Sequence, residues 1–528
     1  MGKISKYLNQ LTIGSVFDNP GVLEAYSTDG SVLKIKPKFV AFPESTDDIC
    51  KLLKFFSQLA EKDIKVAVTP RGSGLDEGGA DLTNGIVIST EKLNKMLEID
   101  TRERLVRVQS GITLRELNTA LSVSGLTIPI EGKDNETIGG LISNNPIDGY
   151  AGKYGGIYDY VERIEAILAN GDCLQTSRLK KYAVAKKAAE KTTEGMIYCK
   201  ISKLLHENKG LLTEISKHPE DKTGYPTITK AGRRETLDLM PMFFGAQGTL
   251  GIITEVILRA VPLKAKAMRV VATFRDIKSA LKYLERVKEL RPLKLDFYNL
   301  KIIAEAKESG KNLDGVIRKL ENGFAVYASF DERANGAMRK IMALKEKLPR
   351  DTKFTFESEK NKTILDEFEN SLSNYLSYAK SSERVPVLTD FYLPPWNIES
   401  FLDDLQVLGD KLKLDLELYG SYNSSIYNLR PKFDLEEPDF NKKVTTFLKA
   451  GAYVIDRQGG KLAGGTPEGR LKAVVTNTEL SKAEKKLYTE IKAIFDPYDI
   501  LNPDVKLGAS SKFTLTHFRV TNLPKIVV

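Results

Sequence analysis

The glycine-rich segment VAVTPRGSGLDEGG narrows the possible folds of this chain more than any other stretch. Gly72, Gly74, Gly78 and Gly79 directly follow an apolar run typical of a buried strand. Glycines allow successive backbone N–H groups to converge on one point, and such nests hold phosphate oxygens. The loop is followed by DLTNGIVIST, a turn and a strand, whereas the Rossmann fingerprint requires a helix there. A Rossmann fold is therefore excluded, which leaves a phosphate-binding loop or an ordinary glycine-rich turn.

Two further glycine-rich segments occur later in the chain. Residues 137–145 read TIGGLISNN, and residues 243–255 read FFGAQGTLGIITE. The first two loops belong to consecutive strand-containing units, and each combines glycines with small polar donors. This pattern suits a long ligand that carries a pyrophosphate and ends in a ring. The third segment, on its own, is equally consistent with a tight entrance to a strand.

Overall charge argues against a nucleic-acid partner. The 528 residues include 79 Lys and Arg against 70 Asp and Glu, a net charge of +9. Spread over this length, the excess falls well short of the clustered basic face of a nucleic-acid-binding protein. We therefore expect no nucleic acid to bind. The length itself predicts two to four domains.

Cysteine and histidine are scarce. Cys50, Cys173 and Cys199 are odd in number and show no CxxC spacing, so neither a disulfide framework nor a thiolate metal site is predicted. The three histidines are far apart in the sequence and match no metal-binding motif. A reducing compartment is expected.

The sequence predicts no membrane span and no signal peptide. No run of 18 apolar residues occurs, and the first 20 residues lack the apolar core of a secretory signal. We expect a cytoplasmic protein, with peripheral attachment to a membrane left open.

Hydrophobic patterning divides the chain into several parts. Residues 1–262 alternate apolar runs with helical patterns, interrupted by a Lys-rich segment, 178–235, that we interpret as a surface insertion. Residues 263–494 alternate strands with amphipathic helices, which predicts an antiparallel sheet covered by helices on one face. Residues 495–510 return to the first part. The β-branched tail, 511–528, is predicted to be either an added strand or a peptide that docks a partner.

Five motifs in this order carry a resemblance to a known family: PRGSG, TIGG with SNN, KYG with LANG, FFGAQGTLGIITE, and FDPYDILNP. They resemble the FAD-linked oxidases with a vanillyl-alcohol-oxidase or p-cresol-methylhydroxylase (PCMH) type FAD-binding domain. The most similar branch contains the D-lactate, glycolate and D-2-hydroxyglutarate dehydrogenases, the glycolate enzyme being also known as glycolate oxidase. The resemblance implies an α+β fold, with a two-subdomain FAD-binding domain and an α+β substrate (cap) domain built on an antiparallel sheet.

The resemblance also implies which residues bind FAD. They come from the pyrophosphate loop and its flanks, the ribityl and ring region, the adenosine side and the returning chain end. The set is Pro70, Arg71, Gly72, Ser73, Gly74, Leu75, Thr137, Gly139, Gly140, Ser143, Asn144, Tyr154, Gly155, Ile253 and Asn502. Relatives that bind FAD covalently often use a histidine in the first loop. Leu75 stands at that place here, so we expect non-covalent FAD.

The chain departs from the family at the metal site. The dehydrogenase branch carries GHxGDGNxH and GEHG segments whose side chains bind a divalent metal. The corresponding stretches here, residues 420–431 and 464–470, contain no histidine. Glu468 alone cannot hold a transition metal, so no metal is expected.

Without these histidines, catalysis must rest on other groups. Tyr392, Tyr422 and Tyr427 lie in the segments that resemble the substrate wall, and a tyrosine beside a cation can act as a base. Arg430 is a candidate for that cation or for a carboxylate clamp. The alternative is that the tyrosines are ordinary strand residues.

These observations predict an FAD-dependent oxidoreductase that oxidises a small, hydroxylated, anionic substrate resembling a 2-hydroxy acid by hydride transfer to flavin. The alternative is a flavin-binding partner subunit whose catalytic wall has decayed. The electron acceptor, whether a quinone, a protein or oxygen, is not indicated by the sequence.

Overall fold

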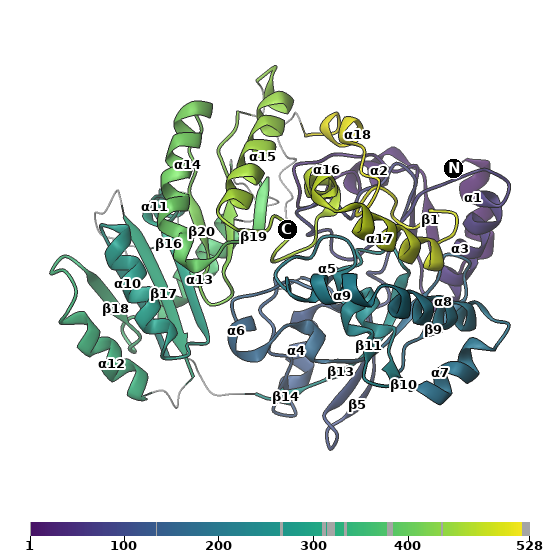
Figure 1. The fold of residues 1–528 in the computed structure, drawn as a ribbon, viewed down its shortest axis with the longest axis horizontal. Helices are drawn as coiled ribbons and strands as arrows, with labels where there is room; N and C mark the ends of the chain where they lie inside the picture. The colour runs from purple at the N-terminus through teal and green to yellow at the C-terminus, as the bar shows by residue number, and fades with distance from the viewer. Residues whose placement is uncertain are drawn as a thin grey trace.

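A computed structural model describes residues 2–133, 135–263, 268–308, 313, 323–331, 335–376, 384–434 and 437–519. Figure 1 shows two parts lying side by side, with the purple, blue and yellow segments on one side and the green segments on the other. The first part is the expected FAD-binding domain and the second is the expected cap. The predicted α+β fold class is confirmed by this arrangement of mixed and antiparallel sheets with helices.

The first lobe of the FAD-binding domain is built on a four-stranded sheet with the order β1-β2-β4-β3, in which β2, β4 and β3 are parallel. Its elements are α1 (Lys3–Leu11), β1 (Ser15–Phe17), α2 (Pro20–Ala25), β2 (Phe39–Phe42), α3 (Thr46–Ala60), β3 (Val68–Arg71) and β4 (Ile86–Ser89). Helix α3 begins at Thr46, because the Ser45 side chain caps it by accepting a hydrogen bond from the Asp48 N–H. The first glycine-rich loop leaves the end of β3.

The second lobe contains an antiparallel sheet with the order β5-β6-β13-β8-β9. Its elements are β5 (Met96–Asp100), β6 (Leu105–Gln109), α4 (Leu114–Ser122), β7 (Leu126–Thr127), α5 (Ile138–Asn144), α6 (Ala151–Tyr154), β8 (Val161–Ile167), β9 (Cys173–Gln175), β13 (Ile252–Arg259) and β14 (Val261–Pro262). Strands β8 and β9 pair across a turn at Asn170-Gly171, where Gly171 adopts a φ of 84°.

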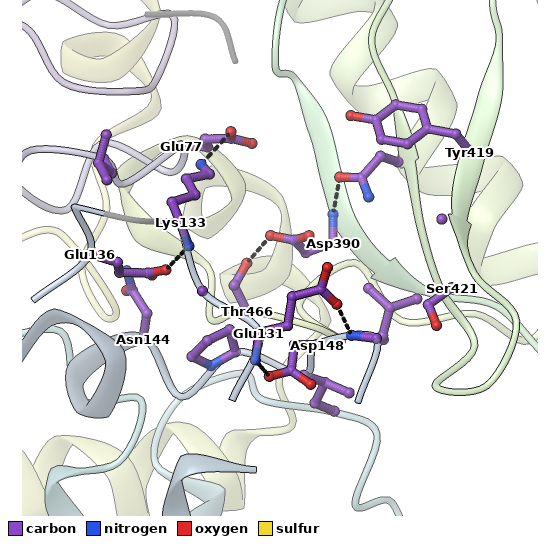
Figure 2. Close-up of a pocket in the computed structure, with 18 of the residues that line it drawn as sticks. Glu77, Glu131, Lys133, Glu136, Asn144, Asp148, Asp390, Tyr419, Ser421 and Thr466 are labelled. Atoms are coloured by element: carbon purple, nitrogen blue, oxygen red, sulfur yellow. Dashed lines mark hydrogen bonds and ion pairs between the residues drawn. The ribbon is translucent and has the colours of Figure 1, made fainter. Parts of the chain in front are cut away.

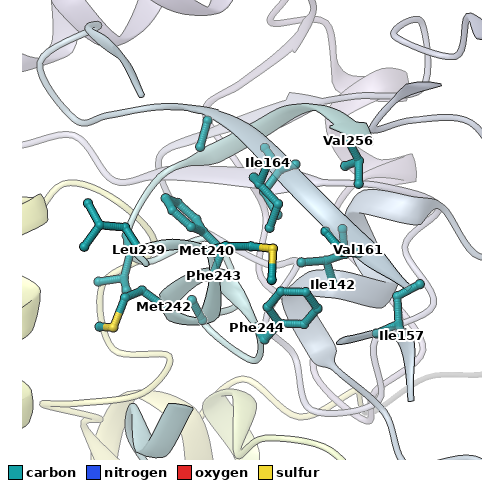
Figure 3. Packing of buried hydrophobic residues seen from close by; sticks show 14 of the residues in the cluster. Ile142, Ile157, Val161, Ile164, Leu239, Met240, Met242, Phe243, Phe244 and Val256 are labelled. Atoms are coloured by element: carbon teal, nitrogen blue, oxygen red, sulfur yellow. The ribbon is translucent and has the colours of Figure 1, made fainter. Parts of the chain in front are cut away.

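Figure 3 shows how this lobe holds the second and third glycine-rich segments together. Ile142 from α5 packs in one apolar cluster with Ile164 of β8, Val256 of β13, and Phe243 and Phe244 of the segment that precedes β13. Both segments are thus fixed by a common core, although they are far apart in the sequence.

Residues 178–235, expected to form a surface insertion, reach into the interior. They form β10 (Leu179–Lys180), α7 (Lys181–Ala188), α8 (Thr193–Glu207), α9 (Lys209–Ser216), β11 (Gly232–Arg233) and β12 (Thr236–Leu237). Tyr198 and Tyr225 are buried in the core of the second lobe. Lys222 Nζ donates hydrogen bonds to the carbonyls of Asn145 and Gly465, at 2.5 and 2.6 Å. The expectation of a surface insertion was wrong for these residues, because the many lysines of the segment hid its apolar periodicity in the sequence.

The cap is built on a seven-stranded antiparallel sheet with the order β18-β15-β17-β16-β20-β21-β19. Its strands are β15 (Met268–Phe274), β16 (Lys294–Asn299), β17 (Phe324–Phe330), β18 (Lys353–Phe356), β19 (Leu388–Tyr392), β20 (Leu418–Ser421) and β21 (Ile426–Leu429), and its helices are α10 (Ile277–Lys288), α11 (Leu300–Glu308), α12 (Asn335–Lys345), α13 (Lys362–Leu376), α14 (Ile398–Leu412) and α15 (Phe440–Arg457).

Helices cover both faces of the cap sheet, whereas the sequence predicted one. Helices α10, α14 and α15 share a core with Leu295 and Phe297 of β16. Helices α11 and α13 share a second core with Tyr327 and Tyr419, on the opposite face. Side chains alternate along a strand, so neighbouring positions belong to different cores. Figure 1 shows α14 and α15 in front of the sheet and α11 and α13 behind it. Part of the second face is not covered by these helices and borders a cavity.

The chain returns to the FAD-binding domain through α16 (Gly469–Glu479) and α17 (Lys482–Phe495). Leu487 and Phe495 already pack in the core of that domain, so the return begins before the expected residue 495. Leu501 then pairs with Val68 of β3.

The tail begins with α18 (Ser511–Leu515), and Phe518 forms a bridge with Leu33. This part docks on its own chain, and residues 520–528 lie outside the described part. Among the described helices, none combines the length and the apolar character needed to cross a bilayer.

Candidate functional site

Two adjoining cavities lie where the three glycine-rich segments meet the cap. A narrow slot runs between β3, α5 and the start of β13, and a larger cavity of about 340 Å³ lies between the first domain and the cap sheet. Asn144 lines both, at the end of α5. The two spaces are therefore neighbours that a single long ligand can span.

Eight of the fifteen predicted FAD-binding residues line the slot, and a ninth lines the larger cavity. Those in the slot are Pro70, Arg71, Gly72, Gly139, Gly140, Ser143, Asn144 and Ile253, and Leu75 lies in the larger cavity. Their backbones approach closely. A Cβ on Gly72 would lie 2.3 Å from Thr137 Oγ1, and one on Gly248 would lie 2.3 Å from Pro70 Cγ. Glycine is required at both places.

The slot offers unused hydrogen-bond donors. Within the described residues, no acceptor is found for the backbone N–H groups of residues 72–75. Arg71 Nη1 is buried and likewise has no partner in the described part of the chain. Buried donors are normally satisfied, and consecutive free N–H groups beside an arginine suit phosphate oxygens. The residues present therefore fit the pyrophosphate of FAD.

The other predicted FAD-binding residues lie outside both cavities: Ser73, Gly74, Thr137, Tyr154, Gly155 and Asn502. Ser73 and Gly74 connect the two lined stretches of the first loop. Thr137 caps α5 by accepting the N–H of Gly140. Tyr154 and Gly155 end α6, and the Tyr154 carbonyl accepts the hydroxyl of Tyr160.

Asn502 does not line the slot but holds together the segments that form it. Its Nδ2 donates to the carbonyls of Ala80 and Gln247, at 2.8 and 2.7 Å, and its Oδ1 accepts the hydroxyl of Thr69 at 2.9 Å. The side chain is 1% exposed. It therefore ties together β3, the end of the first loop and the third glycine-rich segment, instead of facing a ligand.

The larger cavity is rich in carboxylates (Figure 2). Its described lining contains seven acidic residues and two basic ones: Asp76, Glu77, Glu131, Glu136, Asp148, Asp296 and Asp390, with Lys133 and Arg430. The first domain supplies one wall and the cap strands supply the other. Tyr298, Tyr419, Ser421, Asn428 and Thr466 add hydroxyl and amide groups.

Arg430 is the predicted catalytic residue that lines this cavity. It is 5% exposed, and its Nη2 lies 2.5 Å from Glu77 Oε2, across the boundary between the two domains. Its Nε donates to the Tyr419 hydroxyl. Among the described residues, nothing accepts a hydrogen bond from its Nη1. Although burial opposes ionisation, Arg430 and Lys133 together lower the pKa of Glu77 to about 2.

The three predicted tyrosines do not line the cavity, which corrects the sequence interpretation. Tyr427 is fully buried in the core under α14 and α15, and burial raises its pKa well above the usual value. Burial also raises the pKa of Tyr422, to about 12, and that of Tyr392. A base must be ionised to accept a proton, and these phenols stay protonated at neutral pH. The cavity-facing tyrosines are Tyr298 and Tyr419.

Two carboxyl groups of the cavity have pKa values near neutrality. Burial, with the charge of Glu131, raises the pKa of Asp148 to about 7. Burial also raises the pKa of Asp296 to about 7, against the opposing charge of Lys294. The oxygens of Asp148 accept the N–H groups of Glu131 and Tyr150, at 2.7 and 2.9 Å. Asp296 Oδ2 accepts a long contact from the Tyr298 hydroxyl, at 3.5 Å.

The two segments that lack the family histidines do border the cavity. Ser421 and Asn428 come from the first, and Thr466 comes from the second. Glu468 instead points away, where it binds Lys506 at 2.8 Å and the N–H of Gly224. Within the described residues, no group of three or more His, Cys, Asp or Glu side chains is arranged to hold a metal.

The seven cavity acids were not predicted from the sequence. Asp76 and Glu77 lie within the first glycine-rich segment and Glu131 precedes the second, so charge in or near these loops was an available signal. Asp390 carried no signal in the sequence. It adopts a φ of 53° at a bulge in β19, and its carboxylate accepts the Thr466 hydroxyl at 3.1 Å. Such strain is visible only in the structure.

Comparison with known families accounts for both parts of the chain. Residues 37–177 match the FAD binding domain model, and residues 263–505 match the model of the C-terminal domain of FAD linked oxidases. The first match contains the first two glycine-rich loops, and the second contains the cap sheet and the returning chain.

Curated relatives are similar over most of the chain. A D-2-hydroxyglutarate dehydrogenase from Pantoea ananatis is 27% identical over 90% of this chain, but the match covers 48% of that protein. The chain thus spans about half the length of that relative. A D-lactate dehydrogenase from Archaeoglobus fulgidus is 24% identical, with 91% and 95% of the two chains covered. The glycolate oxidase subunit GlcD from Bacillus subtilis is 25% identical, with 88% of each covered.

Solved structures share the fold at low sequence identity. A 4-ethylphenol oxidase from Gulosibacter chungangensis superposes with a TM-score of 0.67 at 13% identity, covering 94% of this chain and 95% of that one. An alkyldihydroxyacetonephosphate synthase gives 0.62 at 15% identity, covering 95% and 86%. With both domains matched, and a slot of unpaired donors that fits the pyrophosphate, the chain belongs to the FAD-linked oxidases, a family of FAD-dependent oxidoreductases.

Proposed function

We propose that this protein oxidises the hydroxyl-bearing carbon of a small 2-hydroxy acid, with FAD held in the slot and the substrate in the larger cavity. The observation that carries the proposal is the buried Arg430 Nη1, which faces no acceptor among the described residues. An unpaired guanidinium donor in a cavity is costly unless a ligand satisfies it. A carboxylate is the ligand that a guanidinium fork binds best.

The charges around Arg430 leave room for one anion. Arg430 and Lys133 are cationic, and Glu77 is firmly ionised between them. Burial raises the pKa of the nearby Glu136, which accepts the backbone N–H of Lys133. Arg430, Lys133 and Glu77 together carry a net charge of +1, which a single carboxylate neutralises.

We assign the proton transfer to Asp296. Its pKa of about 7 suits a general base at neutral pH, and it lies on the same face of the cap sheet as Tyr419, the hydroxyl partner of Arg430. Asp148 has a similar pKa, but its oxygens are fixed by two backbone N–H groups. When bound, FAD supplies the two-electron oxidant that takes up the hydride from the substrate carbon. Asp296 takes the hydroxyl proton, and the product is a 2-oxo acid.

Anaerobic reduction of the bound flavin tests the proposal. The FAD-loaded protein is mixed with glycolate, both enantiomers of lactate and of glycerate, and neutral alcohols, and the flavin absorbance near 450 nm is followed. We expect bleaching by at least one 2-hydroxy acid and none by the neutral alcohols. If none of these compounds bleaches the flavin, the alternative of a flavin-binding partner subunit is supported instead.

A further inference from the structure

The larger cavity contains one place for an anion, and its other cationic groups already have partners. Lys133 Nζ lies 3.0 Å from Glu77 Oε1. Lys294, at the edge of the cavity, pairs with Glu131 and lies 3.7 Å from Asp296 Oδ2. Lys472, a buried lysine that contacts Thr466 of the lining, donates to main-chain carbonyls, including that of Thr389 at 3.2 Å. Among these described cationic groups, only Arg430 retains an unpaired buried N–H.

Three further carboxyl groups of the lining, those of Glu131, Asp148 and Asp390, form a wall that a second carboxylate of a substrate would meet. Glu131 and Asp148 come from the first domain, and Asp390 comes from the cap (Figure 2). Like charges at short range in a partly buried site repel strongly, because little water screens them. Asp148, whose pKa is about 7, is only partly ionised at neutral pH, and Glu131 is paired with Lys294, so the repulsion comes from the group as a whole. A dicarboxylate held at Arg430 would place its second charge against this wall.

The same wall is well suited to hydroxyl groups. An ionised carboxylate is a pure acceptor, and a hydroxyl group can donate to it. Between the carboxylates lie Ser421, Asn428 and Thr466, which both donate and accept. Ser421 lies directly across from Asp296 in the β16–β20 pair, on the same face of the sheet. This wall therefore offers acceptors for several hydroxyl protons and a partner for hydroxyl oxygens.

We propose that the substrate is a polyhydroxylated monocarboxylate, whose single carboxylate binds Arg430 and whose remaining hydroxyl groups bind the wall formed by Glu131, Asp148, Asp390, Ser421 and Asn428, and that this wall excludes dicarboxylates. This inference rests on the proposed function, and it separates this chain from those relatives whose names specify a dicarboxylate, 2-hydroxyglutarate.

The test uses the FAD-loaded wild-type protein and anaerobic stopped-flow reduction. The probes are lactate, glycerate, 2,3,4-trihydroxybutanoate, malate and 2-hydroxyglutarate, each as separate enantiomers or diastereomers. We expect the second-order rate constant of flavin reduction (kred/Kd) for glycerate or the trihydroxy acid to exceed that for lactate by about tenfold and that for both dicarboxylates by about 100-fold. These ratios correspond to one or two well-made polar contacts and to one unfavourable charge, respectively.

The outcomes separate the two proposals. Efficient reduction by malate or 2-hydroxyglutarate, within tenfold of glycerate, overturns the inference and leaves the proposed function standing. Faster reduction by lactate than by either hydroxylated acid also overturns the inference alone. Failure of every acid to reduce the flavin overturns the proposed function, and the inference with it.

A variant tests the wall directly. Glu131→Gln removes one negative charge and leaves Lys294 without its closest partner, so the ratio of kcat/KM for 2-hydroxyglutarate to that for glycerate should rise at least about tenfold. The matched control is Glu162→Gln, which removes an exposed charge paired with Arg259 at 2.6 Å, in β8 of the first domain. The control should leave the ratio unchanged. An unchanged ratio in Glu131→Gln, with FAD content intact, would reject the charged wall as the source of selectivity.

Discussion

Arg430 has a role that a single substitution can separate from cofactor binding. Its side chain lies in the cap, and it does not line the slot. Arg430→Ala should therefore retain FAD while lowering kcat/KM for the acid substrate roughly 10- to 150-fold, the equivalent of losing a charge-assisted contact of about 1.5–3 kcal/mol. Arg430→Lys should recover only part of this loss, because an ammonium cannot bind bidentately. Unchanged kcat/KM in the Ala variant would exclude the clamp.

Asp296 should control the pH dependence of the reaction. Its carboxyl group has a pKa of about 7, and the ionised form is the base, so kcat/KM should rise as the pH rises through about 7 and then level off. Asp296→Asn should lower the rate of flavin reduction about 100-fold or more and abolish this rise. Asp148→Asn is the comparison variant, because Asp148 has a similar pKa but is assigned to binding substrate hydroxyl groups, so this variant should lower kcat/KM and keep the rise with pH. If the rise of kcat/KM with pH disappears in the Asp148 variant and persists in the Asp296 variant, Asp148 is the base and the assignment to Asp296 is wrong.

The glycine-rich segment before β13 should be intolerant of a single methyl group. Gly248 has a φ of 72°, and an added Cβ would lie 2.3 Å from the ring of Pro70, which lines the slot. Gly248→Ala should weaken FAD binding by about 1–3 kcal/mol, roughly 5- to 150-fold in Kd, measured by fluorescence titration of the apoprotein. Gly125→Ala is the control, since Gly125 has a φ of 66° and open space around it. Equal FAD affinity in both variants would contradict the packing argument.

Alternation along the cap strands explains which catalytic residues could be predicted. Tyr427 and Arg430 are three positions apart, so an extended strand places them on opposite faces. The sequence therefore already implied that both could not face one cavity. Arg430 and Asn428 lie on the face of the cap sheet that borders the cavity, whereas Tyr427 lies on the face that packs in the core.

The glycine-rich loops were predictable because backbone geometry demands glycine there. The carboxylate wall was not predictable in the same way. Its members come from loops of the first domain and from β19, β20 and β21, and only the packing of the first domain against the cap brings them together. The alternation of strands and helices sufficed for the fold class. It did not reveal that α11 and α13 cover the second face of the cap sheet.

The complete holoprotein should release its flavin on denaturation. Leu75 lines the larger cavity, at the place where the resemblance implies a histidine in those relatives that bind FAD covalently, and its side chain has no nucleophilic atom. Acid precipitation should therefore leave the yellow colour in the supernatant, with a mass equal to that of free FAD. Colour remaining in the washed pellet would show a covalent bond to another residue.

Turnover should be independent of divalent metals. The two segments that carry metal ligands in the dehydrogenase branch supply Ser421, Asn428 and Thr466 to the cavity, and these neutral groups bind transition metals weakly. Prolonged treatment with a chelator should leave the rate of flavin reduction unchanged. Elemental analysis that finds one tightly bound zinc or manganese per chain would contradict this expectation.

The hydrogen bond between Thr69 and Asn502 joins residues that are 433 positions apart. Between them the ribosome must make the second lobe and the whole cap. At about 5–20 residues per second, this interval lasts roughly 20–90 seconds. During that time the slot lacks the side chain that ties its walls together from behind. The cap can therefore fold before the domain that precedes it is finished, and the site for FAD is assembled near the end of synthesis.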